Sequence, residues 1–232
     1  MAMDLSQARV DRQVLALRPD YRALLITVEG ITPGASDEVI EAMLVSAETS
    51  ARALIGDRPI EDIPQVASWR EAYRAFGAKP QRTRHSLEAL LRRVADGLPR
   101  VNRLTDIYNA ISVTHLIPIG GEDLTRYTGA PRLMRATGSE PFDTMASGED
   151  VIEHPEPGEV VWCDDAGVTC RRWNWRQARR TALREDTTSA LFILDALDPM
   201  SDGELDRAGQ ELIEAVRRLG DDVVVGQRLI RA

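Results

Sequence analysis

The stretch WREAYRAFG at residues 69–77 is dense in aromatic and basic side chains, and CRRWNWRQ at residues 170–177 repeats this mixture. Three of the four tryptophans of the chain lie in these two stretches. Between them, VNRLTDIYN at residues 101–109 sets two asparagines and an aspartate into an apolar, helix-like background. Such polar side chains are buried only where each finds a partner. These stretches stand out in a chain of which only 5% of the residues are aromatic.

The size and composition of the chain predict one domain with a full core. It has 232 residues, of which 43% are hydrophobic, enough to bury a sizeable interior. We expect an N-terminal strand and helix within residues 1–60, packed on a main domain of residues 61–232. No window has the roughly 18 consecutive apolar residues of a membrane span, and the first residues lack a signal-peptide pattern. These features predict a cytoplasmic protein without a membrane partner.

Periodicity and turn residues predict an α+β fold in which helices flank a mixed β-sheet. A strand is expected at residues 21–28, followed by a helix at 37–55 that Ser36 caps. Further helices are predicted at 66–76, from Ser86 to about 96, at 103–115 and at 202–219. The remaining strands are predicted at 133–136, 159–163, 168–173, 190–196 and 223–229.

The net charge of −8 argues against a protein that grips nucleic acid by bulk electrostatics. The charges are nevertheless unevenly distributed, because residues 69–103 hold nine arginines and lysines against three acids. Residues 170–184 hold six arginines and no acid. The pattern fits either a locally basic face on an acidic protein or a set of solvated helix faces.

The sequence predicts neither a metal site nor a disulfide. His85, His115 and His154 are far apart and have no companion ligands at motif spacing. Cys163 and Cys170 match neither a zinc pair nor a redox motif, and we expect two reduced core residues that face each other across a hairpin.

A polar set of amides, carboxylates and glycines is the main candidate for a site. Asn102, Asp106 and Asn109 have the spacing i, i+4 and i+7, which places them on one face of a helix. One interpretation is a network that caps helices and tethers loops, and the other is a pocket that binds an amino acid or a nucleotide. The remaining members are Ser112, Gly120, Gly121, Asp123 and Glu140.

The second aromatic stretch adds Trp173, Asn174, Trp175 and Arg176. On a strand, alternation sends both tryptophans to one face and Asn174 and Arg176 to the other. One face then packs the core while the other offers an amide and a guanidinium to a ligand, or the tryptophans stack on a nucleobase.

The order of these motifs over residues 65–195 resembles the editing domain of the beta subunit of bacterial phenylalanyl-tRNA synthetase, in its free-standing B3/B4 form. The chain differs from the synthetase at residues 173–176, which replace a glycine-rich turn. The synthetase's preference for tyrosine is therefore not carried over to this chain. The residues that carry it are Trp69-Arg70-x-x-Tyr73-x-x-Phe76-Gly77-x-x-Pro80, Ser86-x-Glu88-Ala89-Leu90, Asn102-x-x-x-Asp106-Ile107-x-Asn109, Pro118-x-Gly120-Gly121-x-Asp123, Arg135-x-x-x-x-Glu140-x-Phe142 and Trp173-Asn174-Trp175-Arg176.

The resemblance implies a trans-editing hydrolase that deacylates mischarged aminoacyl-tRNA without a metal or another cofactor. Positioned water attacks the ester with help from a hydroxyl of the terminal tRNA ribose, which suits a chain without a catalytic triad. The partner implied is the aminoacylated acceptor end of a tRNA. The sequence indicates no oligomeric state.

Site roles follow from the same resemblance. Asn102, Asn109 and Glu140 are expected at the amino acid or the attacking water, with Glu140 as a general base or as the partner of the substrate ammonium. Gly120 and Gly121 supply backbone contacts near the ester, and Asp106, Ser112, Asp123, Trp173 and Asn174 complete the substrate-binding set. Trp175 and Arg176 form a pocket wall or hold the terminal adenosine. The alternatives are a non-catalytic module that binds tRNA ends or an amino acid, and a small-molecule hydrolase.

Overall fold

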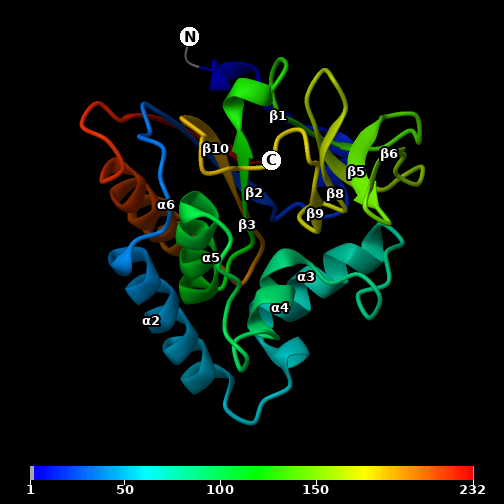
Figure 1. Cartoon of the computed structure of the whole chain (residues 1–232). Coiled ribbons are helices and arrows are strands. Elements are labelled where there is room, and N and C mark those ends of the chain that lie inside the picture. The colour runs from blue at the N-terminus through cyan, green and yellow to red at the C-terminus, as the bar shows by residue number, and fades with distance from the viewer. Residues whose placement is uncertain (1–2, 232) are drawn as a thin grey trace.

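The computed structural model describes residues 3–231 and contains two larger sheets, a hairpin and a layer of helices (Figure 1). The four-stranded sheet is antiparallel, with the order β11 (Val224–Arg231), β2 (Arg22–Glu29), β10 (Ser189–Ala196) and β3 (Ile119–Asp123). The five-stranded sheet has the order β1 (Arg9–Val10), β4 (Arg132–Arg135), β7 (Val160–Cys163), β8 (Val168–Arg171) and β9 (Arg176–Gln177). It is mixed, because β1 runs parallel to β4. Strands β5 (Phe142–Ala146) and β6 (Glu149–Glu153) form the hairpin.

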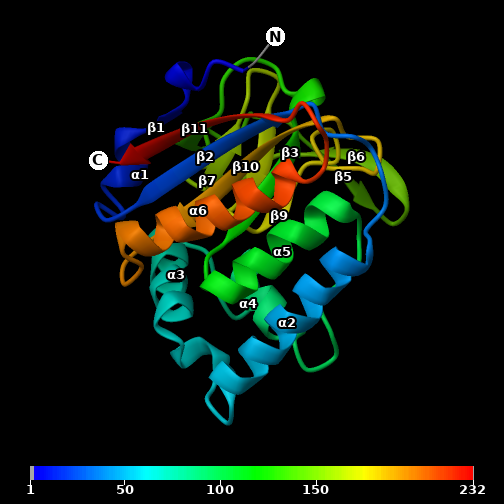
Figure 2. The ribbon, with the colours of Figure 1, turned by 90° about the vertical axis from the view of Figure 1, so that its left-hand side faces the viewer.

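Helices cover one side of the four-stranded sheet and close one end of the molecule (Figure 2). Helices α5 and α6 pack on the sheet, and α2 packs on α5. The helices are α1 (Arg12–Leu15), α2 (Glu38–Ile55), α3 (Pro64–Ala75), α4 (Ser86–Leu91), α5 (Arg103–His115) and α6 (Asp202–Arg217), with short 3-10 turns η1 (Leu5–Gln7), η2 (Ile60–Asp62) and η3 (Leu124–Arg126).

Strand β10 separates two parts of the core. Successive side chains of a strand point to opposite faces, so Phe192 and Leu194 pack under α5 and α6. Leu191 and Ile193 point to the opposite face and join Trp162 and Trp173 of the other layer. The site is built on this second face.

The predicted α+β class is confirmed, and most predicted elements lie within two residues of their observed bounds. The predicted cap of α2 is wrong by one residue: the side chain of Asp37 accepts a hydrogen bond from the backbone of Ile40 at 3.0 Å, while the Ser36 hydroxyl donates to Asp106. Helix α4 is shorter than predicted, because Arg92 to Asp96 continue as turns. Strand β3 and the β5–β6 hairpin were not predicted.

Residues before position 60 contribute a central part of the fold. Strand β2 is hydrogen-bonded to β11 on one side and to β10 on the other, and α2 packs on α5. The boundary predicted at residue 60 stays a prediction. Across the described residues, none of the helices is long and apolar enough to cross a membrane.

The Gly120–Gly121 pair lies inside β3, and only the second glycine is required by packing. A Cβ atom at Gly121 would lie 2.6 Å from Cδ1 of Leu183 and 2.9 Å from Cε1 of Tyr108. A Cβ atom at Gly120 would meet only Nε2 of Gln177, at 3.3 Å.

We predict that Gly121→Ala lowers the free energy of unfolding by about 1–3 kcal/mol, because the added methyl group overpacks the core. The matched Gly120→Ala variant should change it by less than ~1 kcal/mol. Urea unfolding of both variants tests this, and equal destabilisation would contradict the packing argument.

Candidate active site

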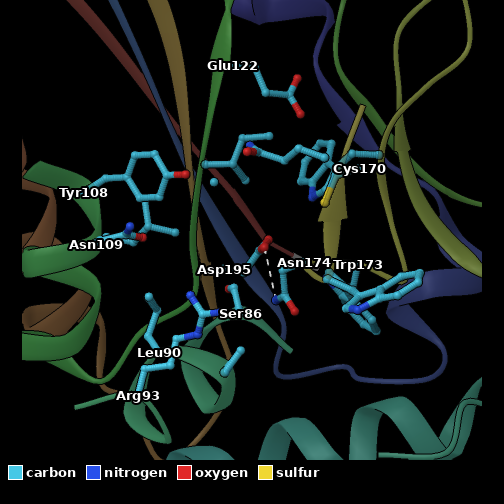
Figure 3. Close-up of a pocket in the computed structure, with 17 residues that line it drawn as sticks. Ser86, Leu90, Arg93, Tyr108, Asn109, Glu122, Cys170, Trp173, Asn174 and Asp195 are labelled. Carbon is cyan, nitrogen blue, oxygen red and sulfur yellow. Dashed lines mark hydrogen bonds between the residues drawn. The ribbon is translucent and has the colours of Figure 1, made fainter. Parts of the chain in front are cut away.

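A pocket of about 320 Å³ lies between the two larger sheets, α4 and α5. Strands β3 and β10 supply its back through Gly120, Glu122, Ile193 and Asp195, and α5 supplies Asn109. Figure 3 shows Arg93 and Leu90 at one end, Asp195 near the middle and Glu122 at the other end. Arg93 is exposed and Glu122 is 1% exposed, so we place the mouth at Arg93 and the floor at Glu122.

The wall opposite α5 is a tight turn instead of the predicted strand. Strand β8 ends at Arg171, and Arg172 and Trp173 adopt left-handed backbone angles with φ of 48° and 68°. Such angles are costly for bulky residues and persist only where the surroundings enforce them. The predicted alternation of residues 173–176 across two faces of a strand is therefore wrong.

Burial of Trp173 holds this turn in place. The side chain is fully buried, and its ring packs edge-on against Tyr21 at 5.0 Å and Trp69 at 5.4 Å between centroids. Its backbone N–H donates to the carbonyl of Val160, and the carbonyl of Asn174 accepts from Ser86 at 3.0 Å. The turn thereby fixes the start of α4 as well as the pocket wall.

Asp195 lies at the centre of the pocket in a hydrogen-bond network of neutral groups. Its carboxyl accepts from the Tyr21 hydroxyl at 2.5 Å and from the Asn174 amide at 3.3 Å, and Tyr73 donates to the Asn174 oxygen at 3.0 Å. Burial raises the pKa of Asp195 to about 7, against the opposing effects of Tyr21, Asn174 and the nearby Trp162 indole. The group therefore titrates near neutral pH, where a proton acceptor is most useful.

Glu122 forms the floor, and its Oε2 atom is buried without a hydrogen-bond partner among the described residues. Burial raises the pKa of Glu122 to about 8, while the hydroxyls of Thr169 and Tyr127 lower it. The charges nearby act in opposite directions, since Asp164 raises this pKa and Arg180 lowers it.

Further polar groups face the pocket without a hydrogen-bond partner in residues 3–231, among them the indole N–H groups of Trp162 and Trp173. The Ser86 hydroxyl is buried without a partner, and the Asn109 amide makes no side-chain hydrogen bond although it is only 6% exposed. Buried polar groups in folded proteins are nearly always paired. Their convergence on one pocket with Glu122 therefore indicates a site for a polar ligand.

Of the residues predicted from sequence, five line this pocket. They are Asn109, Gly120, Trp173, Asn174 and Trp175. These five come from α5, β3 and the turn, which only the folded chain brings together.

Four other predicted site residues stabilise helix ends and loops through hydrogen bonds, as in the interpretation of a capping network. Asn102 caps α5 by accepting from the backbone of Thr105, and it also donates to the carbonyl of Leu183. Asp106 accepts from the backbone of Val101 and from Ser36. Ser112 donates to the carbonyl of Ile117, and Asp123 accepts from Thr125 and Thr187.

The other three also lie outside the pocket lining. Glu140 is in the loop between β4 and β5, where its carboxylate accepts from the backbone N–H groups of Thr137 and Gly138 at 3.0–3.1 Å. Arg176 donates to the carbonyl of Met145. Gly121 packs against Leu183 and Tyr108 as described above.

Sequence reasoning missed Glu122, Asp195, Ser86 and Arg93. A signal for Asp195 was present, because an aspartate interrupts the apolar run ALFIL in a strand predicted at residues 190–196. A charged residue on the buried side of a strand requires a partner or a function.

The cysteines contribute no reactive thiolate to the pocket. Burial raises the pKa of Cys170 well above its ordinary value, and Cys163 lies in a separate apolar cluster. Both are free and buried as predicted, but they do not face each other, because Cys170 pairs with Trp162 and Cys163 with Val168.

These features define an α+β protein with a deep pocket between its sheets. A family model described as the B3/4 domain matches residues 68–207. The match spans more than half of the chain, so the chain belongs to the B3/4 domain family, as predicted. No curated protein matches the chain.

Among solved structures, the chain is similar to an N-terminal fragment of the phenylalanyl-tRNA synthetase beta subunit from Pyrococcus horikoshii, at 10% sequence identity and a TM-score of 0.48. The match covers 100% of this chain and 56% of that fragment.

We predict that Glu122→Gln stabilises the fold increasingly as the pH rises. Between pH 4.5 and about 8 the unfolded state loses a proton that the folded Glu122 keeps, so wild-type stability falls through this range. Glutamine removes this effect, and the variant should gain roughly 1–4 kcal/mol over wild type by pH 8. Urea unfolding at pH 4.5 and pH 8 measures the difference.

The matched control is Glu140→Gln. Partial burial raises the pKa of Glu140, but hydrogen bonds from Thr137 and Gly138 bring it below its ordinary value. This variant should therefore lose stability relative to wild type as the pH rises. A Glu122→Gln variant with no pH-dependent gain would show that Glu122 is already ionised in the folded protein.

Proposed function

We propose that this chain hydrolyses the ester bond of an aminoacyl-tRNA. The observation that carries the proposal is the set of unpartnered polar groups in an otherwise apolar pocket, in a chain of the B3/4 domain family. Such a pocket suits the aminoacyl group, with the ester at the mouth and the side chain inside.

The chemistry needs orientation more than a strong nucleophile, because an aminoacyl ester is already activated. Ser86 and Asn109 lie on α4 and α5 with free hydrogen-bonding capacity, and they orient the ester carbonyl and the attacking water. A ribose hydroxyl of the tRNA end assists the proton transfer. We leave Glu140 out of this proposal, since its carboxylate lies outside the pocket lining.

Exposed cations at the mouth and in a neighbouring groove support a nucleic-acid partner. Arg93 lines the pocket, and Lys79 and Arg82 line a neighbouring groove together with Arg172. Arg172 immediately precedes the residues of the turn that form the pocket wall, so the two hollows share this turn. In the described chain, Lys79, Arg82 and Arg93 form no salt bridge, and the phosphates of the acceptor end are suitable partners for them.

We predict multiple-turnover loss of at least one class of ester when the protein is mixed with a panel of correctly and incorrectly charged tRNAs. Asn109→Ala should lower kcat by about 10²–10³, the usual effect of removing one positioned donor. Glu140→Ala, the matched control, should deacylate like wild type.

Circular dichroism of each variant confirms folding before the rates are compared. A folded Asn109→Ala protein that deacylates as fast as wild type would remove Asn109 from the mechanism. Salt-dependent tRNA binding without ester loss across the panel would instead favour the non-catalytic binding module.

We also predict that the double variant Lys79→Ala/Arg82→Ala binds tRNA more weakly and with a shallower salt dependence. Two lost phosphate contacts should reduce the slope of log K against log salt by about 1–2. The tRNA affinity is measured by filter binding at salt concentrations of roughly 50 to 300 mM, which bracket the physiological value of about 150 mM. The control is the double variant Arg207→Ala/Arg217→Ala. Both arginines are exposed on α6, the helix that covers the other face of the four-stranded sheet. An equal loss of tRNA binding in this control would refute a defined docking surface.

A further inference from the structure

In the described part of the chain, two buried carboxyl groups lack a cation, and both line the same pocket. Eight aspartates and glutamates are buried within residues 3–231. Four pair with an arginine, and Asp106 and Asp123 are bonded by backbone N–H and hydroxyl groups. The four arginine pairs are Glu48–Arg100, Glu88–Arg70, Glu159–Arg171 and Asp164–Arg180. Glu122 and Asp195 remain, and neither forms a salt bridge in this part of the chain.

A ligand with positive charge is the natural counter-ion for such groups. An unpaired buried carboxylate is costly, and burial raises the pKa values of both groups. A bound ammonium or guanidinium group favours the ionised carboxylate and offsets the cost of burying both charges.

The spacing of the two acids fits a long ligand. Glu122 pairs with Leu191 across the β3–β10 ladder, four residues before Asp195 on the same face of β10. Four residues along a strand correspond to about 13 Å between Cα atoms. A ligand that contacts both carboxyl groups therefore needs an extended stem between its two cations.

The surface between the acids is largely apolar. Ile193 lies between Leu191 and Asp195 on this face, and its partner across the ladder is Gly120. Gly120 places no side chain above Ile193, although the Gln177 amide borders this space, 3.3 Å from where a Cβ atom of Gly120 would lie. The Trp162 and Trp173 side chains also line the pocket. Methylene groups pack on such a surface, and aromatic faces favour a nearby cation.

We propose that the pocket takes an aminoacyl group with a long basic side chain, of the lysine, ornithine or arginine class, with its α-ammonium at Asp195 and its terminal cation at Glu122. Arg93 at the mouth fixes the direction, since it repels either cation and attracts the phosphate end of an aminoacyl-tRNA. This inference rests on the proposed function for the nature of the ester, and its ligand class is tested separately from turnover.

The test measures binding of amino-acid amides to the full chain by titration calorimetry, with L-lysinamide against L-norleucinamide, which has a similar stem without the terminal cation. We expect lysinamide to bind at least ~10-fold more tightly. Glu122→Gln should abolish this preference. A Glu140→Gln control should keep the preference.

Three results would overturn the inference: no measurable lysinamide binding, binding of norleucinamide or tyrosinamide as tight as that of lysinamide, or a preference that survives Glu122→Gln. The deacylation panel separates this outcome from failure of the proposed function. Rapid loss of phenylalanyl or tyrosyl esters without a lysinamide preference keeps the hydrolase and rejects the basic ligand. Glu122-dependent lysinamide binding without any ester loss keeps the ligand class and rejects hydrolysis.

Discussion

Burial of the Trp173 side chain is the interaction on which the site depends. The indole packs edge-on against Tyr21 next to β2 and against Trp69 on α3, and so connects both sheets and a helix. Because aromatic pairs of this kind add to the large area that each ring buries, the turn at Arg172 and Trp173 is held at backbone angles that these residues otherwise avoid. The same turn presents Asn174 to Asp195 and its carbonyl to the start of α4.

The two faces of β10 divide structural and chemical roles. Phe192 and Leu194 on one face pack with α5 and α6. Asp195, on the other face, lies in the same pocket as Glu122 of β3. A carboxyl group in this position is tolerated because neutral donors satisfy it and because protonation avoids a buried charge. Rigid packing on one face thus holds a titratable group in place on the other.

The polar residues of α5 show why a motif and a site differ. Asn102, Asp106 and Asn109 share one helix and a regular spacing, yet their surroundings give them separate tasks. Asn102 and Asp106 satisfy backbone N–H groups at the start of the helix, whereas Asn109 is two turns further and reaches the pocket with its amide free. Spacing placed these residues near one face but could not identify which amide would lack an intramolecular partner.

The sequence by itself determined the α+β class, the long helices, the buried strands β2 and β10 and the family, because periodicity, caps and motif order are local properties of the chain. It did not reveal β3, since a pair of glycines is unfavourable inside a strand, nor the turn at residues 172–175, whose angles are imposed by burial of Trp173. Only the tertiary structure brought Ser86, Glu122 and Asp195 to one pocket and placed Glu140 elsewhere. The physical reason is that burial, and with it the pKa of a carboxyl group, is set by neighbours that are distant in sequence.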